Sequence, residues 1–174
     1  MNFLVALCII IMNHFIIYDF DKTKNPNDWF IVDDVVMGGI SSSGIIINKN
    51  GNGVFNGHVS IENNGGFSSV RHQFKSIDIS DYRCFIIRIK GDGKKYQFRV
   101  KSSLNEYHSY KYEFSTNKKW QEIEIPFKSM KATFRGRTLD MPSFENNQLE
   151  EICFLIANKK EEDFTFEIDE IIVK

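Results

Sequence analysis

The sequence predicts an all-β fold, a jelly-roll β-sandwich, and three observations point to it. The 174 residues include 16 Phe and 23 Ile, and aromatic and β-branched side chains favour strands. Apolar and polar residues alternate with a period of two in segment after segment, as in half-buried antiparallel strands. Turn signals rich in Asn and Gly separate these segments, and no window of a dozen residues carries the apolar stripe of a helix. Roughly ten strands without a strand-helix-strand rhythm favour a sandwich.

Five segments show the alternation most clearly, and in each the apolar set is expected to face the core. The sets are Phe55, Gly57, Val59 and Ile61; Phe85, Ile87 and Ile89; Tyr96, Phe98 and Val100; Ile123 and Ile125; and Phe164, Phe166 and Ile168. Polar neighbours such as Arg88 are expected on the opposite face of the sheet. Turns are expected at 50–53, 63–66 and 91–93. The strand pattern is absent from Lys128 to Glu150, and we expect a short helical turn there.

Length and charge are those of an ordinary folded domain. At 174 residues the chain has room for one domain with one buried core. The 22 basic and 23 acidic residues give a net charge of −1, so no nucleic-acid partner is expected. Three Cys and three Pro exclude disulfide scaffolds and Pro-rich chains. Cys84 and Cys153 lie in apolar strand-like runs, which favours inert buried thiols, although a disulfide between them stays open.

Residues 1–13 form an apolar leader ahead of the sandwich, which is expected to occupy residues 14–174 as a single domain. The apolar run Phe3–Met12 spans about half of a bilayer core as a helix, so no transmembrane span is expected. Its length fits the hydrophobic region of a signal peptide, but no Lys or Arg precedes it and no small-residue cleavage site follows. The domain is expected to be exported or periplasmic if the leader acts as a signal peptide, and cytoplasmic otherwise.

The most unusual local sequence is Asp33-Asp34 followed closely by Gly38-Gly39. The carboxylates could satisfy buried backbone amides or bind a hard cation. Hydrogen bonding is favoured because two carboxylates alone make a weak calcium site, and no metal site is expected. The adjacent glycines permit a positive φ or a close backbone approach. Arg71, which follows Gly65-Gly66-Phe67, either meets a carboxylate, carbonyl or ligand or lies on a solvated strand face.

The sequence shows no pattern typical of a catalytic centre. The four His residues lack the spacing of common metal sites, no Gly-x-Ser-x-Gly sequence is present, and no carboxylate pair stands out. Tyr107, Tyr110 and Tyr112 form an aromatic cluster in the sequence. Near the basic residues Arg99 and Lys111, they could stack on sugar rings or bases or form ordinary cross-strand pairs, of which the pairs are commoner. We expect neither enzymatic activity nor a cofactor.

Several short motifs follow one another in an order that is more specific than any one of them. In order they are Trp29, Asp34-Val35-Val36-Met37-Gly38-Gly39-Ile40-Ser41, Phe55-Asn56-Gly57, Gly65-Gly66-Phe67-Ser68-Ser69-Val70-Arg71, Gly91-Asp92-Gly93, Trp120 and Arg135-Gly136-Arg137. With these motifs the chain resembles the complex I intermediate-associated protein 30 family over residues 15–173. The resemblance covers nearly the whole chain.

This resemblance implies a galactose-binding-like jelly-roll sandwich, in agreement with the strand pattern. The family is named for an assembly factor of mitochondrial respiratory complex I, the NADH:ubiquinone oxidoreductase, where it acts as a chaperone-like binder of membrane-arm intermediates. The family supplies no established catalytic residues. The chain has no recognisable Arg- and Ser-rich transit peptide, so it resembles a bacterial stand-alone member.

Two functions are therefore expected. The first is a non-catalytic protein-binding module whose partner is an assembly intermediate of a membrane complex. Its candidate binding residues are Asp34, Gly38, Gly39, Gly65, Gly66, Phe67 and Arg71. The alternative is a carbohydrate-binding module of the galactose-binding-like type. Its candidate glycan-binding residues are Tyr110, Tyr112, Arg71 and Arg99. The Gly-rich motifs can also reflect the needs of folding alone, because sharp corners of a sandwich require Gly.

Overall fold

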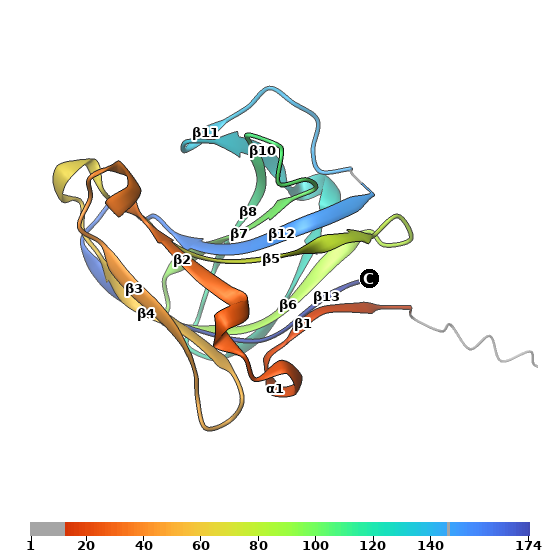
Figure 1. The fold of residues 1–174 in the computed structure, drawn as a ribbon, viewed down its shortest axis with the longest axis horizontal. Helices are drawn as coiled ribbons and strands as arrows, with labels where there is room; N and C mark the ends of the chain where they lie inside the picture. Colours follow the sequence, from red (N-terminus) through yellow and green to blue (C-terminus); the bar gives the residue numbers. More distant parts are fainter. Residues whose placement is uncertain (1–12, 146) are drawn as a thin grey trace, which may run out of the picture.

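Thirteen strands form two facing antiparallel sheets in the computed structural model, which describes residues 13–145 and 147–174 (Figure 1). The predicted all-β sandwich is confirmed. The apolar leader expected at residues 1–13 lies outside the described residues except for Asn13. Among the described residues, no helix is both long and apolar enough to cross a membrane.

One sheet has six strands and is organised around the last strand of the chain. Its members are β3 (Ser42–Ile47), β4 (Gly53–Val59), β13 (Glu162–Val173), β6 (Cys84–Gly91), β9 (Trp120–Pro126) and β1 (Phe15–Asp19). β13 pairs with β6 along one edge. Along the other edge of β13, β4 pairs with the first half of β13 and β1 pairs with its second half. The long strand β13 therefore joins the beginning of the chain to the body of the sheet.

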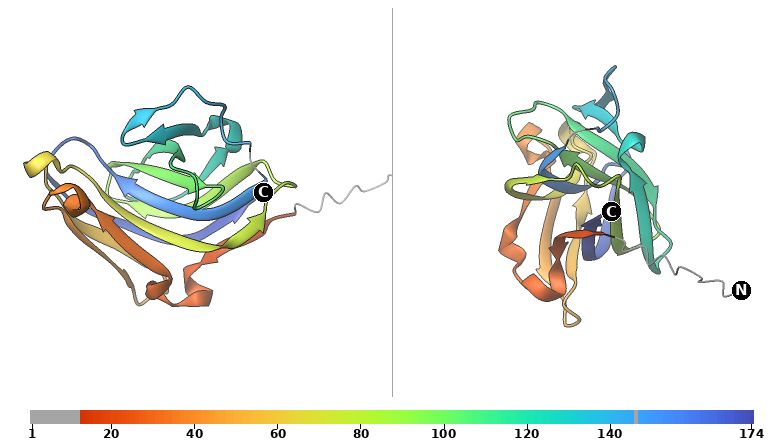
Figure 2. Two further views of the ribbon diagram at one scale, coloured as in Figure 1. Left: turned by 45° about the horizontal axis from the view of Figure 1, so that its top comes forward. Right: turned by 90° about the vertical axis from the view of Figure 1, so that its right-hand side faces the viewer.

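The other sheet has seven strands. In spatial order they are β11 (Arg137–Thr138), β10 (Lys131–Phe134), β8 (Ser109–Ser115), β7 (Lys95–Lys101), β12 (Gln148–Ile156), β5 (Ser68–Asp78) and β2 (Trp29–Asp33). β12 lies in the middle of the curved layer, between β7 and β5. Figure 2 shows this sheet strongly curled, with the short hairpin of β10 and β11 (cyan) raised above β12.

The helical segments of the described chain are all single turns. They are α1 (Phe20–Thr23), η1 (Pro26–Asp28), η2 (Asp34–Met37), η3 (Glu62–Asn64) and η4 (Phe127–Ser129). Local capping explains several of them. The side chain of Asp19 accepts a hydrogen bond from the N–H of Lys22 at the start of α1, and Asn25 caps η1 in the same way ahead of Pro26.

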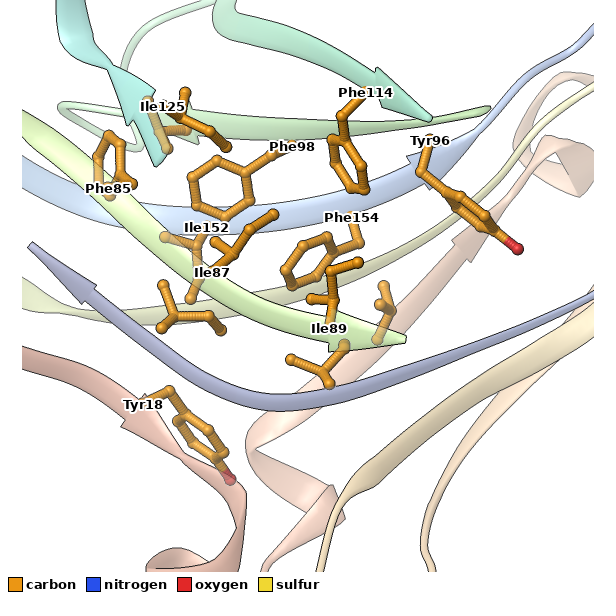
Figure 3. Close-up of a cluster of buried hydrophobic side chains, with 14 of the residues drawn as sticks. Tyr18, Phe85, Ile87, Ile89, Tyr96, Phe98, Phe114, Ile125, Ile152 and Phe154 are labelled. Atoms are coloured by element: carbon orange, nitrogen blue, oxygen red, sulfur yellow. The ribbon is translucent and has the colours of Figure 1, made fainter. Parts of the chain in front are cut away.

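The two sheets enclose a core rich in aromatic side chains (Figure 3). Phe154 of β12 is fully buried at its centre. Its ring centroid lies 6.2 Å from that of Trp29, 5.2 Å from that of Phe98 and 5.1 Å from that of Phe166, which connects both sheets. Burial of each such side chain contributes about 1.5–3 kcal/mol, so this aromatic contact network fixes the spacing of the layers.

All five segments with clear alternation form strands, and nearly all of their apolar sets face the core. Ile61 is the exception, since β4 ends at Val59 and Ile61 is exposed where the chain turns into η3. The short helical turn expected between Lys128 and Glu150 is present as η4 at the start of this stretch. The expected lack of strands there is wrong, because the short strands β10 and β11 and the first residues of β12 lie within it. Cys84 and Cys153 are both free and buried, as favoured.

Candidate functional site

One carboxylate joins three stretches of chain at one end of the sandwich. Asp34 is fully buried at the start of η2. It accepts hydrogen bonds from the backbone N–H groups of Ser41 at 2.9 Å, Gly66 at 2.7 Å and Phe67 at 3.2 Å. The hydroxyl of Ser41 donates a fourth hydrogen bond. These contacts hold η2 and the η3 turn side by side, the orange and yellow turns of Figure 1.

The glycine pairs Gly38-Gly39 and Gly65-Gly66 make this arrangement possible. A Cβ on Gly39 would lie 2.3 Å from Oδ1 of Asp34, and one on Gly65 would lie 2.7 Å from its Oδ2. Gly38 and Gly66 have φ values of +93° and +126°, which residues other than Gly rarely adopt. Asp34 therefore satisfies buried backbone amides, which is the situation favoured for it from the sequence.

The same hydrogen bonds keep Asp34 charged. Burial alone would raise the pKa of Asp34, but the donors on Ser41, Gly66 and Phe67 outweigh burial and hold the pKa below its ordinary value of 3.8. A charged carboxylate makes stronger hydrogen bonds to backbone N–H groups than a neutral one. The charge of Asp34 therefore stabilises both loops.

A groove with a volume of about 420 Å³ lies on the outer face of the seven-stranded sheet. The loop 64–67, held by Asp34, forms one wall, and residues 133–136 of the β10–β11 hairpin form another. Arg71, Arg99 and Leu155 contribute to its floor. The volume falls within the range of ligand sites, about 300–1,000 Å³.

Two arginines lie across the floor of the groove. Strand register places Arg71 of β5 and Arg99 of β7 opposite Cys153 of β12, one on each side. Their neighbours along each strand belong to the core, so these three side chains point to the outer face. Arg99 donates from Nε and Nη2 to Oε1 of Gln97 at 2.9 and 2.6 Å. Arg71 reaches Oε1 of Glu151 at 3.4 Å.

Aromatic side chains and a further cation border the groove. Tyr107 is 64% exposed, and its ring centroid lies 5.3 Å from that of Phe134 in an edge-on contact. The guanidinium of Arg135 lies 5.3 Å from the centre of the Phe134 ring. His108 is buried next to Tyr107, and within the described residues neither of its ring nitrogens has a hydrogen-bond partner.

The η2 turn exposes apolar side chains beside the groove. Val35, Val36 and Met37 are 62%, 71% and 59% exposed, and Met37 also lines the groove. Their backbone is fixed because Asp34 starts the turn and Gly38 ends it. The turn therefore holds these apolar side chains at the surface and away from the core.

The structure brings together five of the residues expected in a binding site. Gly65, Gly66, Phe67, Arg71 and Arg99 all line the groove. Arg71 meets a carboxylate, which is one of the two situations expected for it.

Other expected residues lie elsewhere. Asp34, Gly38 and Gly39 shape the adjoining loops from beneath and do not line the groove. Tyr110 and Tyr112 lie on the side of β8 that faces the core, and the ring centroid of Tyr110 lies 5.1 Å from that of Phe144. They are therefore on the opposite face of the sheet from the two arginines and do not join them in one site.

Sequence reasoning missed His108 and the β10–β11 hairpin with Phe134 and Arg135. The motif Arg135-Gly136-Arg137 was visible in the sequence, but its place opposite the loop 64–67 depends on pairing between β10 and β8. Lys101, which follows Val100 in the alternating segment, also lines the groove. Within the described ranges, no group of three or more His, Cys, Asp or Glu side chains could hold a metal ion.

Comparison with known families decides the classification. The family model of complex I intermediate-associated protein 30 (CIA30) matches residues 18–168. The chain belongs to the CIA30 family. The resemblance carried by the ordered motifs is thereby confirmed. The Asp34 hub, by which we mean Asp34 with its donors Ser41, Gly66 and Phe67, falls within the matched range, and so do all residues that line the groove.

Solved structures with the same fold include carbohydrate-binding modules. A family 11 module from Clostridium thermocellum, in complex with a β-1,3-1,4-mixed-linked tetrasaccharide, is 20% identical with a TM-score of 0.68, over 92% of this chain and 94% of that one. A mutant of the family 29 module CBM29-2 is 12% identical with a TM-score of 0.52, over 93% and 91%. An exo-β-agarase matches with a TM-score of 0.56 at 12% identity. The match covers 91% of this chain but only 24% of the agarase. At these identities the likeness shows the fold alone.

Substitution of Gly39 tests the crowding around Asp34. Gly39→Ala is expected to lower the free energy of unfolding by about 1–3 kcal/mol, because its Cβ collides with the carboxylate. Gly44→Ala is the matched control, since nothing lies within 4 Å of the added Cβ. Urea unfolding of both variants checks this, and equal effects would show that the contact at Gly39 is unimportant.

The pH dependence of stability tests the charge of Asp34. Its pKa in the folded protein lies below the unfolded value, so its contribution is complete above about pH 4 and is lost as the pH falls through the folded pKa. Between pH 5 and pH 3 (roughly the span of carboxylate titration), wild type should therefore lose more unfolding free energy than Asp34→Asn. Asp81→Asn removes one exposed carboxylate away from the two loops and serves as control. An unchanged slope in Asp34→Asn would contradict this account.

Proposed function

We propose that residues 14–174 form one non-catalytic domain that binds a partner protein, in an assembly role like the one for which the CIA30 family is named. The observation that carries this proposal is the exposed apolar turn Val35–Met37 beside the groove. Family membership supports the assembly role, because the family is named for a protein associated with an intermediate of complex I.

The chemistry of the turn favours a protein partner over a glycan. Sugars are held chiefly by flat aromatic rings and by hydrogen bonds, whereas Val35, Val36 and Met37 are non-aromatic and lack strong hydrogen-bonding groups. Exposed clusters of such side chains are typical of protein interfaces. Their burial against an apolar partner surface would release about 25 cal/mol for each Å² removed from water. Because Met37 lines the groove as well, turn and groove can contact one partner together.

An incomplete membrane complex offers a suitable surface. Its subunits expose apolar area that later subunits cover, and a domain with an apolar turn can shield that area in the meantime. The domain leaves when the incoming subunit makes more favourable contacts, because the two compete for the same surface. This exchange needs no nucleotide and no chemical step. An assembly intermediate of complex I is the partner we propose.

A second candidate function is carbohydrate binding. Tyr107 and Phe134 present aromatic rings at the rim of the groove, which is the kind of side chain that stacks on sugar rings. The fold is shared with a family 11 module that was solved with a bound tetrasaccharide. That likeness is a fold-level analogy, and the rings of Tyr107 and Phe134 are the specific observation in favour.

Replacement of the apolar turn tests the proposed assembly role. In the source organism, loss of the protein is expected to reduce fully assembled NADH:ubiquinone oxidoreductase on native gels, and wild type is expected to restore it. A triple variant with Ser at Val35, Val36 and Met37 should fail to restore it while keeping its thermal stability, because all three side chains are exposed. Ile46→Ser, which changes an exposed aliphatic residue on β3, is the control and should restore assembly. Full restoration by the triple variant would contradict the proposal.

Calorimetric titration with mixed-linked β-glucan oligosaccharides tests the second candidate. If the groove binds glycan, Tyr107→Ala should weaken binding by about tenfold, since an aromatic contact contributes on the order of 0.5–1.5 kcal/mol beyond the apolar area that it buries. Trp120→Ala, at an aromatic residue of the other sheet, should leave binding unchanged. Titrations without heat across a broad panel of sugars would exclude carbohydrate binding.

A further inference from the structure

We propose that the groove recognises carboxylate groups on an extended acidic segment of the partner protein, with Arg99 and Arg71 as the principal contacts. This inference rests on the proposed function, since it names the chemistry of the segment that the groove receives. It goes further because neither the family nor the shared fold assigns a ligand to these arginines.

The charge of the groove is one-sided. Among the described residues that line it are four cationic side chains, Arg71, Arg99, Lys101 and Arg135, and no Asp or Glu. The chain as a whole has a net charge of −1. The groove is therefore locally positive although the whole chain is close to neutral, and this local charge attracts anionic groups.

Most of these cations lack an anionic partner within the described part of the chain. Arg99 donates only to the neutral Oε1 of Gln97, and Lys101 donates to the backbone carbonyl of Glu106 at 2.6 Å. Arg71 has the carboxylate of Glu151, but at a distance of 3.4 Å. By contrast, Arg88 on the other sheet approaches Asp169 to 2.6 Å. The groove thus has unused capacity to bind negative charge.

Arg99 is the most favourable position for such a contact. Its side chain is only partly exposed, and its hydrogen bonds go to the neutral Oε1 of Gln97. Burial and the charge of nearby Arg71 accordingly lower its pKa. A carboxylate placed on it would gain more than one on an exposed arginine, because the surrounding dielectric is lower. The planar guanidinium can hold a carboxylate through two parallel hydrogen bonds.

The groove is long enough for more than one residue of an occupant. A neighbouring hollow shares Gly65, Gly66, Arg99, Gly136 and Ala157 with it, so Arg99 lies where the two meet. The second hollow adds the cations Lys111 and Lys159 together with one carboxylate, Glu113. Lys111 pairs with Glu113 at 3.0 Å. Net positive charge therefore extends along both hollows.

Two further features favour a peptide as the occupant. The shared walls include Gly66 and Gly136, where an added Cβ would meet nothing within 4 Å, so the missing side chains leave room for a polypeptide backbone to approach. The apolar turn Val35–Met37 lies next to the groove, which suits a segment that carries acidic and apolar side chains together.

Binding of labelled oligopeptides tests this inference. Fluorescence anisotropy of the purified domain is measured with a labelled hexaglutamate, the neutral hexaglutamine and a hexamer of galacturonic acid. Hexaglutamate is expected to bind at least about tenfold more tightly than hexaglutamine, and added salt should weaken it. Equal affinity for the two peptides, or no binding of hexaglutamate, would overturn the inference.

Variants locate the contact. Arg99→Met keeps the length and apolar stem of the side chain and should weaken hexaglutamate by at least about tenfold. Ser109→Glu introduces a carboxylate into the groove with Arg99 intact and should have a similar effect if Arg99→Met fails to fold. Arg88→Met on the other sheet is the matched control and should change the affinity by less than about twofold. Unchanged binding in both groove variants would overturn the inference.

The outcomes separate this inference from the proposed function. If galacturonate binds through Arg99 and hexaglutamate does not, the occupant is an acidic glycan and the peptide assignment is wrong. If complex assembly depends on Val35–Met37 but not on Arg99, the assembly role holds and the carboxylate contact is wrong. If hexaglutamate binds through Arg99 but loss of the protein leaves complex I unchanged, the groove is correct and the partner must be another protein.

Discussion

The carboxylate of Asp34 is the interaction on which the functional end of the molecule depends. It is fully buried and accepts hydrogen bonds from Ser41, Gly66 and Phe67, which belong to two loops far apart in sequence. Hydrogen bonds to a charged group are each worth about 1.5–3 kcal/mol. A backbone N–H left unpaired in this interior would be similarly unfavourable. The two loops therefore hold one arrangement relative to each other.

This arrangement produces the features that we connect with function. On the outer side of the hub, η2 exposes Val35, Val36 and Met37, and on its inner side the loop 64–67 forms a wall of the groove. The sheet supplies the rest, since alternation along β5 and β7 turns Arg71 and Arg99 away from the core. One end of the sandwich thus combines an apolar contact surface with a basic groove.

The sequence was sufficient to predict the fold because the alternation is strong. Phe98 and Phe166 lie in segments whose apolar positions all point one way, so strands and core followed directly from the pattern. Tyr110 and Tyr112 show the limit of such reasoning. They were grouped with Arg99 by their closeness in sequence. Cross-strand register instead pairs Tyr112 with Phe98 and places it on the core side. Register between strands depends on long-range pairing, which a single sequence does not reveal.

The hub could be anticipated only in part. Two carboxylates followed by adjacent glycines indicated buried backbone amides, and Asp34 meets that expectation. That its partners would include Gly66 and Phe67, more than thirty residues away, could not be read from the sequence. The β10–β11 hairpin was missed for a similar reason, because its two strands are short and only their pairing with β8 defines them.

Amide hydrogen exchange in wild type and in Asp34→Ala is the most direct measurement of this coupling. In wild type the amides of Ser41, Gly66 and Phe67 should exchange slowly. In the variant, the amides of both loops should exchange faster together, while β6 and β7 keep their protection. Faster exchange in only one loop, or in neither, would contradict the account that a single carboxylate fixes both.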